Sequence, residues 1–186
     1  MSGVRSPRAA RVSVDAVATA AVLSAPVPSV WRALVFYEQL DARPSWLLRL
    51  LLPIPVRTER GAWIAGAETR CLYEKGWIVK RLTRVEPPSR CEFDVVGQRL
   101  ELAGGIRLVG GRYELSEETG SRTRLRLETR YEGAARPRRL WRPIEAAVCG
   151  MFHRHIVESL RRGLERTAEV GSRSQAEARA RSRGLG

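Results

Sequence analysis

Two histidines and a cysteine are the side chains best suited to acid–base or nucleophilic chemistry, and all three lie in one segment with helical periodicity. Cys149 precedes His153 by one helical turn, a spacing at which a thiol and an imidazole can act as nucleophile and base. No third group that would orient the imidazole is visible, and cysteine is commonly a small buried apolar residue, so packing is the favoured interpretation. His153 and His155 are two residues apart, so they diverge on a helix and are not expected to share a metal ion.

A second set of polar residues lies on surfaces that are otherwise apolar. His155 and Ser159 are one helical turn apart on the apolar stripe of that segment, and Thr129 and Tyr131 lie on the apolar face of the preceding strand. A few polar groups that converge in an apolar pocket are typical of small-ligand sites. Alternatively, His155 is a core histidine with a nearby hydrogen-bond partner, because buried polar groups must be paired. His153 is expected on the opposite side of the helix.

The strand that carries Thr129 and Tyr131 has the clearest alternation in the sequence. Its buried face is predicted to hold Thr123, Leu125, Leu127, Thr129 and Tyr131. Its solvent face is predicted to hold Arg122, Arg124, Arg126, Glu128, Arg130 and Glu132. This period of two indicates an antiparallel sheet that is covered on one side. Earlier strands, separated by turn signals from residue 57 onwards, repeat the pattern at Cys91, Phe93, Val95, Tyr113 and Leu115.

Helical spacing returns after Pro137 and continues to about Glu169. One broad face of this helix is predicted to hold Ile144, Val148, Met151, Phe152, His155, Ile156 and Ser159. A sheet with one apolar face and a helix with one apolar stripe are expected to pack together. Upstream, the pattern predicts a first strand over 12–23 and two short helices, over 29–35 and 38–52. The glycine pair at 110–111 predicts a bulge or sharp bend.

Three segments in this order resemble the START-like superfamily, the helix-grip or SRPBCC proteins. They are "APVPSVWRALVFYEQL" at residues 25–40, "VEPPSRCEFDVVG" at 85–97 and "GGRYELSEETGSRTRLRLETRY" at 110–131. The resemblance covers roughly residues 12–168. The superfamily includes polyketide cyclases and aromatases, lipid-transfer domains and coenzyme-Q-binding proteins.

The resemblance implies an α+β fold in which a curved antiparallel sheet of about seven strands wraps around a long C-terminal helix. It also implies a cavity between the two that takes lipids, polyketides or other small apolar molecules. The residues expected to line it are Phe93, Tyr113, Leu125, Leu127, Thr129, Tyr131, Val148, Met151, Phe152, His155 and Ser159. Many members only bind or carry a ligand, so we assign no catalytic residue and expect no cofactor or metal.

A net charge of +13 raises the alternative of a nucleic-acid or anionic-surface partner. Of the 33 basic residues, however, only Lys75 and Lys80 are lysine, a skew that indicates base-composition bias. The arginines of the last strand alternate with glutamates and have no aromatic residue beside them for base stacking, so a solvated face is favoured. A specific nucleic-acid partner is therefore not expected.

The apolar segment Trp46–Val56 is too short to span a membrane, which requires about 20 residues. It could be a lid over the cavity, ordinary core or a peripheral membrane contact. Asp15 interrupts the apolar run near the N-terminus, so a secretory leader is not expected. Three widely spaced cysteines favour the reducing cytoplasm.

The chain is expected to form one ligand-binding domain over 12–170, between basic disordered tails at 1–11 and 171–186. The leading hypothesis is a non-enzymatic binder or carrier of a small apolar molecule. The alternatives are a polyketide cyclase or aromatase that uses polar cavity residues, and an interaction protein with an anionic partner. The ligand and the oligomeric state do not follow from the sequence.

Overall fold

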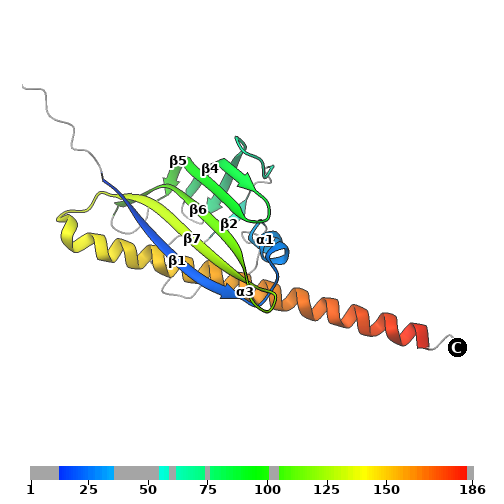
Figure 1. Cartoon of the computed structure of the whole chain (residues 1–186). Helices are drawn as coiled ribbons and strands as arrows, with labels where there is room; N and C mark the ends of the chain where they lie inside the picture. The colour runs from blue at the N-terminus through cyan, green and yellow to red at the C-terminus, as the bar shows by residue number, and fades with distance from the viewer. Residues whose placement is uncertain (1–12, 36–54, 59–61, 74–75, 101–104, 184–186) are drawn as a thin grey trace, which may run out of the picture.

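Seven antiparallel strands form one sheet in the computed structural model, which describes residues 13–35, 55–58, 62–73, 76–100 and 105–183. The strands are β1 (Val14–Leu23), β2 (Pro55–Thr58), β3 (Glu68–Tyr73), β4 (Gly76–Glu86), β5 (Arg90–Leu100), β6 (Ile106–Glu118) and β7 (Arg122–Gly133). Their order is β1-β7-β6-β5-β4-β3-β2, and the helix α3 (Arg138–Arg183) passes beneath the sheet (Figure 1). The predicted α+β class, with about seven strands and a long C-terminal helix, is confirmed.

The helix α1 (Val27–Val35) follows β1, as predicted from the prolines and the helical spacing after them. At its start, the backbone N–H groups of Ser29 and Val30 donate hydrogen bonds to the carbonyl oxygen of Pro26. Its buried side chains, Val30, Trp31 and Leu34, pack into the main core. The second short helix, predicted over 38–52, lies outside the described residues.

The alternation predicted for β7 is confirmed. Leu125 and Leu127 are fully buried, whereas the intervening arginines face solvent. The glycine pair of β6 also behaves as predicted, because the register with β7 shifts between Leu108 and Gly110. A Cβ atom on Gly111 would lie 2.7 Å from both a β7 carbonyl oxygen and the ring of Phe93, so only glycine fits this bend.

The predicted facing of α3 is right for Val148, Ile156 and Ser159, which are buried, and wrong for Ile144 and His153. Ile144 was expected on the inner stripe but is 51% exposed, whereas His153, expected outside, is 1% exposed. Besides His153 and Ile156, the buried face contains Glu145, Cys149 and Leu160, and these five residues recur at helical spacing. Glu145 and His153 are polar. A search for an apolar stripe misses such residues, which are buried because they have hydrogen-bond partners.

The helix α3 continues to Arg183 and so includes residues 171–183, which belong to the tail predicted as disordered at 171–186. Figure 1 shows this end of α3 projecting beyond the sheet. Its sequence has little apolar content but is rich in Arg and Ala, which have high intrinsic helix propensity. The N-terminal tail predicted at 1–11 lies outside the described residues, and the domain boundaries remain a prediction.

Candidate functional site

A hollow lies between the inner face of the sheet and α3. It contains about 750 Å³ of space not filled by atoms, including the part that is open to solvent. We call it the inner hollow; the described residues that line it are Tyr73, Ile78, Lys80, Phe93, Val95, Leu100, Ile106, Leu108, Gly110, Tyr113, Thr129, Val148, Cys149, Phe152, His153 and Ile156. The lining is mostly apolar with a few polar groups, as in pockets that bind small molecules.

Five of the predicted cavity residues line the inner hollow: Phe93, Tyr113, Thr129, Val148 and Phe152. The other six are absent from its lining: Leu125, Leu127, Tyr131, Met151, His155 and Ser159. Leu125, Leu127 and Tyr131 belong to the packed core instead, although they share the inner face of β7. His155 is partly buried and Ser159 is 4% exposed, but neither lines the inner hollow.

His153 is one of the polar residues that line the inner hollow, and sequence reasoning placed it on the wrong side of the helix. Its Nε2 lies 2.8 Å from Thr129 Oγ1, and its Nδ1 lies 2.9 Å from Thr19 Oγ1. A neutral imidazole has one donor and one acceptor nitrogen, and a hydroxyl can serve either. Burial lowers the pKa of His153 to about 4, so the imidazole is neutral at physiological pH.

The three cysteines are buried and have free thiols. Burial, with a smaller contribution from the Glu145 carboxylate, raises the pKa of the Cys149 thiol to about 11. A thiol in this state is a poor nucleophile at neutral pH. The two ring nitrogens of His153 contact threonine hydroxyls, so the arrangement favours packing over a Cys149–His153 catalytic pair.

A second hollow adjoins the first and contains about 430 Å³ of space not filled by atoms, including the part that is open to solvent. Its described lining residues are Leu34, Val35, Trp63, Thr69, Cys71, Lys80, Leu82, Cys91, Phe93 and Tyr113. Lys80, Phe93 and Tyr113 therefore line both hollows. The rings of Phe93 and Tyr113 are 5.5 Å apart, and the Lys80 ammonium lies 5.1 Å from the centre of the Phe93 ring.

A buried ionic cluster attaches the start of α3 to the edge of the sheet. The Arg138 guanidinium donates to both carboxylate oxygens of Glu145 at 2.7 Å and also pairs with Asp15. Arg142 Nε lies 2.9 Å from the other Asp15 oxygen. Glu145 is 1% exposed, so its charge depends on Arg138 for compensation. The pairs of Arg138 and Arg142 with Asp15 join the start of α3 to the edge strand β1.

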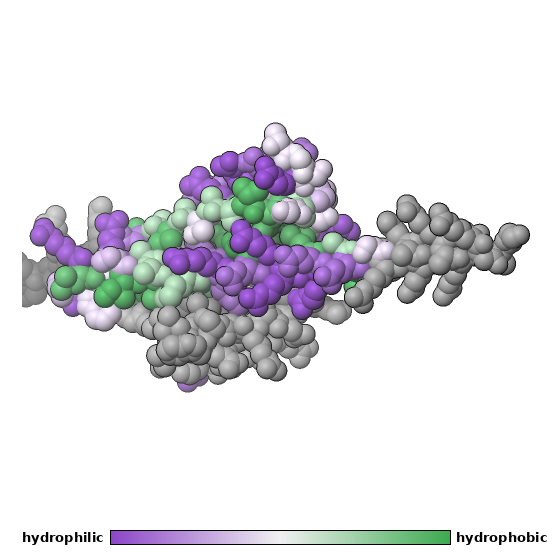
Figure 2. Space-filling model, turned by 90° about the horizontal axis from the view of Figure 1, so that it is seen from below, coloured by the Kyte–Doolittle hydropathy of each residue, from purple (hydrophilic) through white to green (hydrophobic). Residues whose placement is uncertain are grey.

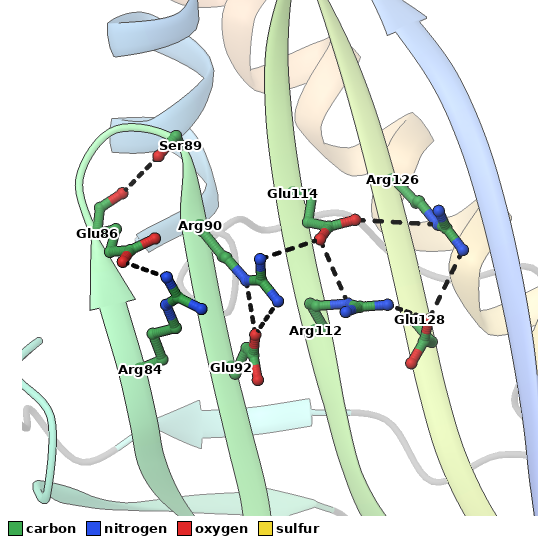
Figure 3. Close-up of polar contacts among 9 residues, drawn as sticks. All are labelled: Arg84, Glu86, Ser89, Arg90, Glu92, Arg112, Glu114, Arg126 and Glu128. Carbon is green, nitrogen blue, oxygen red and sulfur yellow. Dashed lines mark hydrogen bonds and ion pairs between the residues drawn. The ribbon is translucent and has the colours of Figure 1, made fainter.

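The outer face of the sheet carries alternating opposite charges. The ion pairs join three arginines to three glutamates: Arg90, Arg112, Arg126, Glu92, Glu114 and Glu128 (Figure 3). The Arg112 Nη2 donates to Glu128 Oε2 at 2.7 Å, and the Arg90 Nε donates to Glu92 Oε1 at 2.6 Å. Phosphate binding would compete with these carboxylates, so this face does not favour a nucleic-acid partner.

Exposed apolar side chains occur at the start of α3, where Leu140 and Ile144 are 66% and 51% exposed. Figure 2 shows hydrophobic surface at this end of the molecule, beside a hydrophilic band along the middle of the view. Among the described residues, no helix is long and apolar enough to cross a membrane. The segment 46–56, predicted as lid, core or membrane contact, lies outside the residues whose side chains are described.

The comparison with solved structures identifies the architecture. The chain matches the aromatase/cyclase Zhui from Streptomyces sp. R1128 with a TM-score of 0.59, at 14% identity, over 84% of this chain and 96% of that one. It matches a START superfamily protein from Mycobacterium smegmatis with a TM-score of 0.57, at 11% identity, over 82% and 98%. The chain has the START-like helix-grip fold.

A third helix-grip neighbour is DynU16, a protein of the dynemicin biosynthetic locus, with a TM-score of 0.53 at 19% identity. That match covers 81% of this chain and 47% of DynU16, so the chain spans about half the length of that protein. No protein-family model matches the sequence, and no curated protein matches it. The resemblance proposed from the sequence is confirmed at the level of the fold.

Proposed function

We propose that this protein binds a small apolar molecule in the inner hollow, as a carrier or binding protein. The observation that carries the proposal is the lining, in which apolar side chains of the sheet and α3 surround a few polar groups. The helix-grip fold supports it, because this fold typically binds hydrophobic ligands. Three buried free thiols are consistent with the reducing cytoplasm as its location.

The test uses two adjacent valines of β5 that face opposite ways. Val95 lines the inner hollow, whereas Val96 is 44% exposed. We expect the wild-type protein to bind the neutral dye Nile red with enhanced fluorescence. Val95→Trp should lower the affinity about tenfold or more, because the indole takes the space of the ligand.

Val96→Trp is the matched control and should leave the affinity unchanged, because its indole points to solvent. Circular dichroism and thermal melting establish that both variants are folded. Nile red binding that is equal in the two variants would place the dye elsewhere and contradict the proposal.

A polyketide cyclase or aromatase is the second candidate function. Its support is the neutral imidazole of His153 in the lining, together with the structural match to an aromatase/cyclase. An imidazole can serve as a general base when it reaches the substrate. Both of its nitrogens already contact threonine hydroxyls, which favours the carrier. A cyclase would require that His153→Gln abolishes turnover of a polyketide while its uptake persists.

A further inference from the structure

The first turns of α3 present apolar side chains to solvent. Leu140 and Ile144 are 66% and 51% exposed, and Pro143 and Ala147 are exposed beside them. Leu140, Ile144 and Ala147 recur at helical spacing, so they share one face of the helix. Figure 2 shows hydrophobic surface at this end of the molecule, with hydrophilic surface beside it. We call Leu140, Pro143, Ile144 and Ala147 the outer α3 patch.

The surroundings of the outer α3 patch are positively charged. Glu145 is the only Asp or Glu in residues 134–154, and it is 1% exposed. Arg136, Arg139 and Arg154 are exposed in the same segment. Arg154 lies on the face of the patch, about two turns further along the helix. The exposed surface of this segment therefore carries positive charges and no negative charge.

This combination fits a membrane surface that contains anionic lipids. Helices that lie on membranes have an apolar face, which enters the boundary between head groups and acyl chains, and basic residues, which attract anionic lipids. The net charge of +13 acts in the same direction. A second copy of the chain would bring equal positive charges together at this surface, so charge complementarity favours the lipid.

The same turns of α3 line the inner hollow on their other side. Val148, Cys149 and Phe152 belong to the lining of the hollow. A membrane in contact with the outer α3 patch would therefore lie about one helix diameter from the inner hollow.

We propose that the outer α3 patch binds the surface of a membrane that contains anionic lipids. The inference goes beyond the proposed function and does not depend on it, because it concerns the outside of the molecule. In a carrier, this contact would bring the inner hollow to the membrane from which an apolar molecule is taken up.

The test measures binding of the full chain to vesicles by co-sedimentation. One set of vesicles is phosphatidylcholine alone, and the other contains about 30% phosphatidylglycerol, which is anionic. We expect about tenfold or tighter binding to the anionic vesicles, with a preference that weakens at high salt. Leu140→Ser/Ile144→Ser should lower the affinity for these vesicles about tenfold or more, because two apolar side chains no longer enter the lipid.

Ile64→Ser is the matched control for the apolar residues and should leave the affinity unchanged. Ile64 is 63% exposed and precedes β3, which lies near the opposite edge of the sheet from β1. Arg139→Gln should lower the affinity about fivefold. Arg122→Gln, at the end of β7 far from α3, should leave it unchanged. Thermal melting verifies that each variant is folded, and Leu140→Ser alone provides the comparison if the double variant does not fold.

An absence of binding to anionic vesicles would overturn the inference, and so would equal affinity of the wild type and Leu140→Ser/Ile144→Ser. A wild-type dimer in light scattering that the double variant converts to a monomer would also overturn it, because a second copy would then cover the patch. Nile red binding without vesicles tests the proposed function separately, so either proposal can fail while the other stands.

Discussion

The buried His153 makes the stability of the protein depend on pH in a defined direction. Burial lowers its pKa in the folded state from 6.5 to about 4. Between these values the unfolded chain binds a proton that the folded chain does not, so stability falls as the pH falls. The contribution is fully present above pH 6.5 and is lost progressively towards pH 4.

The size of the effect follows from the same two values. At about 1.4 kcal/mol per pH unit, the difference between 6.5 and about 4 corresponds to about 3 kcal/mol of unfolding free energy. His153 is 1% exposed, so solvent screening reduces this figure little. Most of the loss is expected by pH 4.5. Since a domain is typically stable by about 5–15 kcal/mol, the effect is large enough to measure.

The assay is urea unfolding of the wild type and of His153→Gln at pH 7.5 and pH 4.5. Glutamine offers the threonine hydroxyls a donor and an acceptor but does not titrate. We expect the wild type to lose about 2–3 kcal/mol more than the variant between the two pH values. His155→Gln is the control and should change the pH dependence less, because His155 is only partly buried.

Nuclear magnetic resonance of the wild-type histidine rings provides an independent measurement, which holds even if His153→Gln does not fold. The His153 ring should titrate with a pKa of about 4. A His153 pKa near 6.5, or equal pH dependence in the wild type and His153→Gln, would refute the argument that this ring is buried between the two threonines.

Two further predictions concern stability and are measured by thermal or urea unfolding. Leu127→Arg should prevent cooperative folding, because it buries an unpaired charge, whereas Arg126→Leu on the other face of β7 should be nearly neutral; similar behaviour would contradict the half-buried strand. Arg138→Met should lower the melting temperature far more than Arg139→Met, because it leaves the buried Glu145 carboxylate uncompensated, and equal effects would show that this cluster does not anchor α3.

The sequence was sufficient for the fold because the features that define it are local. The alternation in β7, the helical spacing after Pro137 and the bend at 110–111 each depend on residues a few positions apart. Hydrophobic periodicity records which side of an element is buried when that side is uniformly apolar. The face of β7 was predicted correctly for this reason.

The inward position of Lys80 could also have been predicted from the sequence. This lysine lies between Ile78 and Leu82 at a spacing of two, so the alternation that correctly predicted β7 also predicts an inward side chain here. A charged residue on an apolar face marks a functional candidate, but its position at the wall of two hollows depends on Phe93 and Tyr113 from other strands.

Tertiary structure alone decided the burial of the polar side chains of α3 and the polar groups at the site. His153 is buried because Thr19 and Thr129, 134 and 24 residues away, supply hydrogen bonds to its ring. Glu145 is buried because Arg138 compensates its charge, and Arg138 also reaches Asp15, 123 residues away. A polar side chain enters a protein interior only when partners are present, and the partners of His153 and Asp15 become neighbours only after the chain has folded.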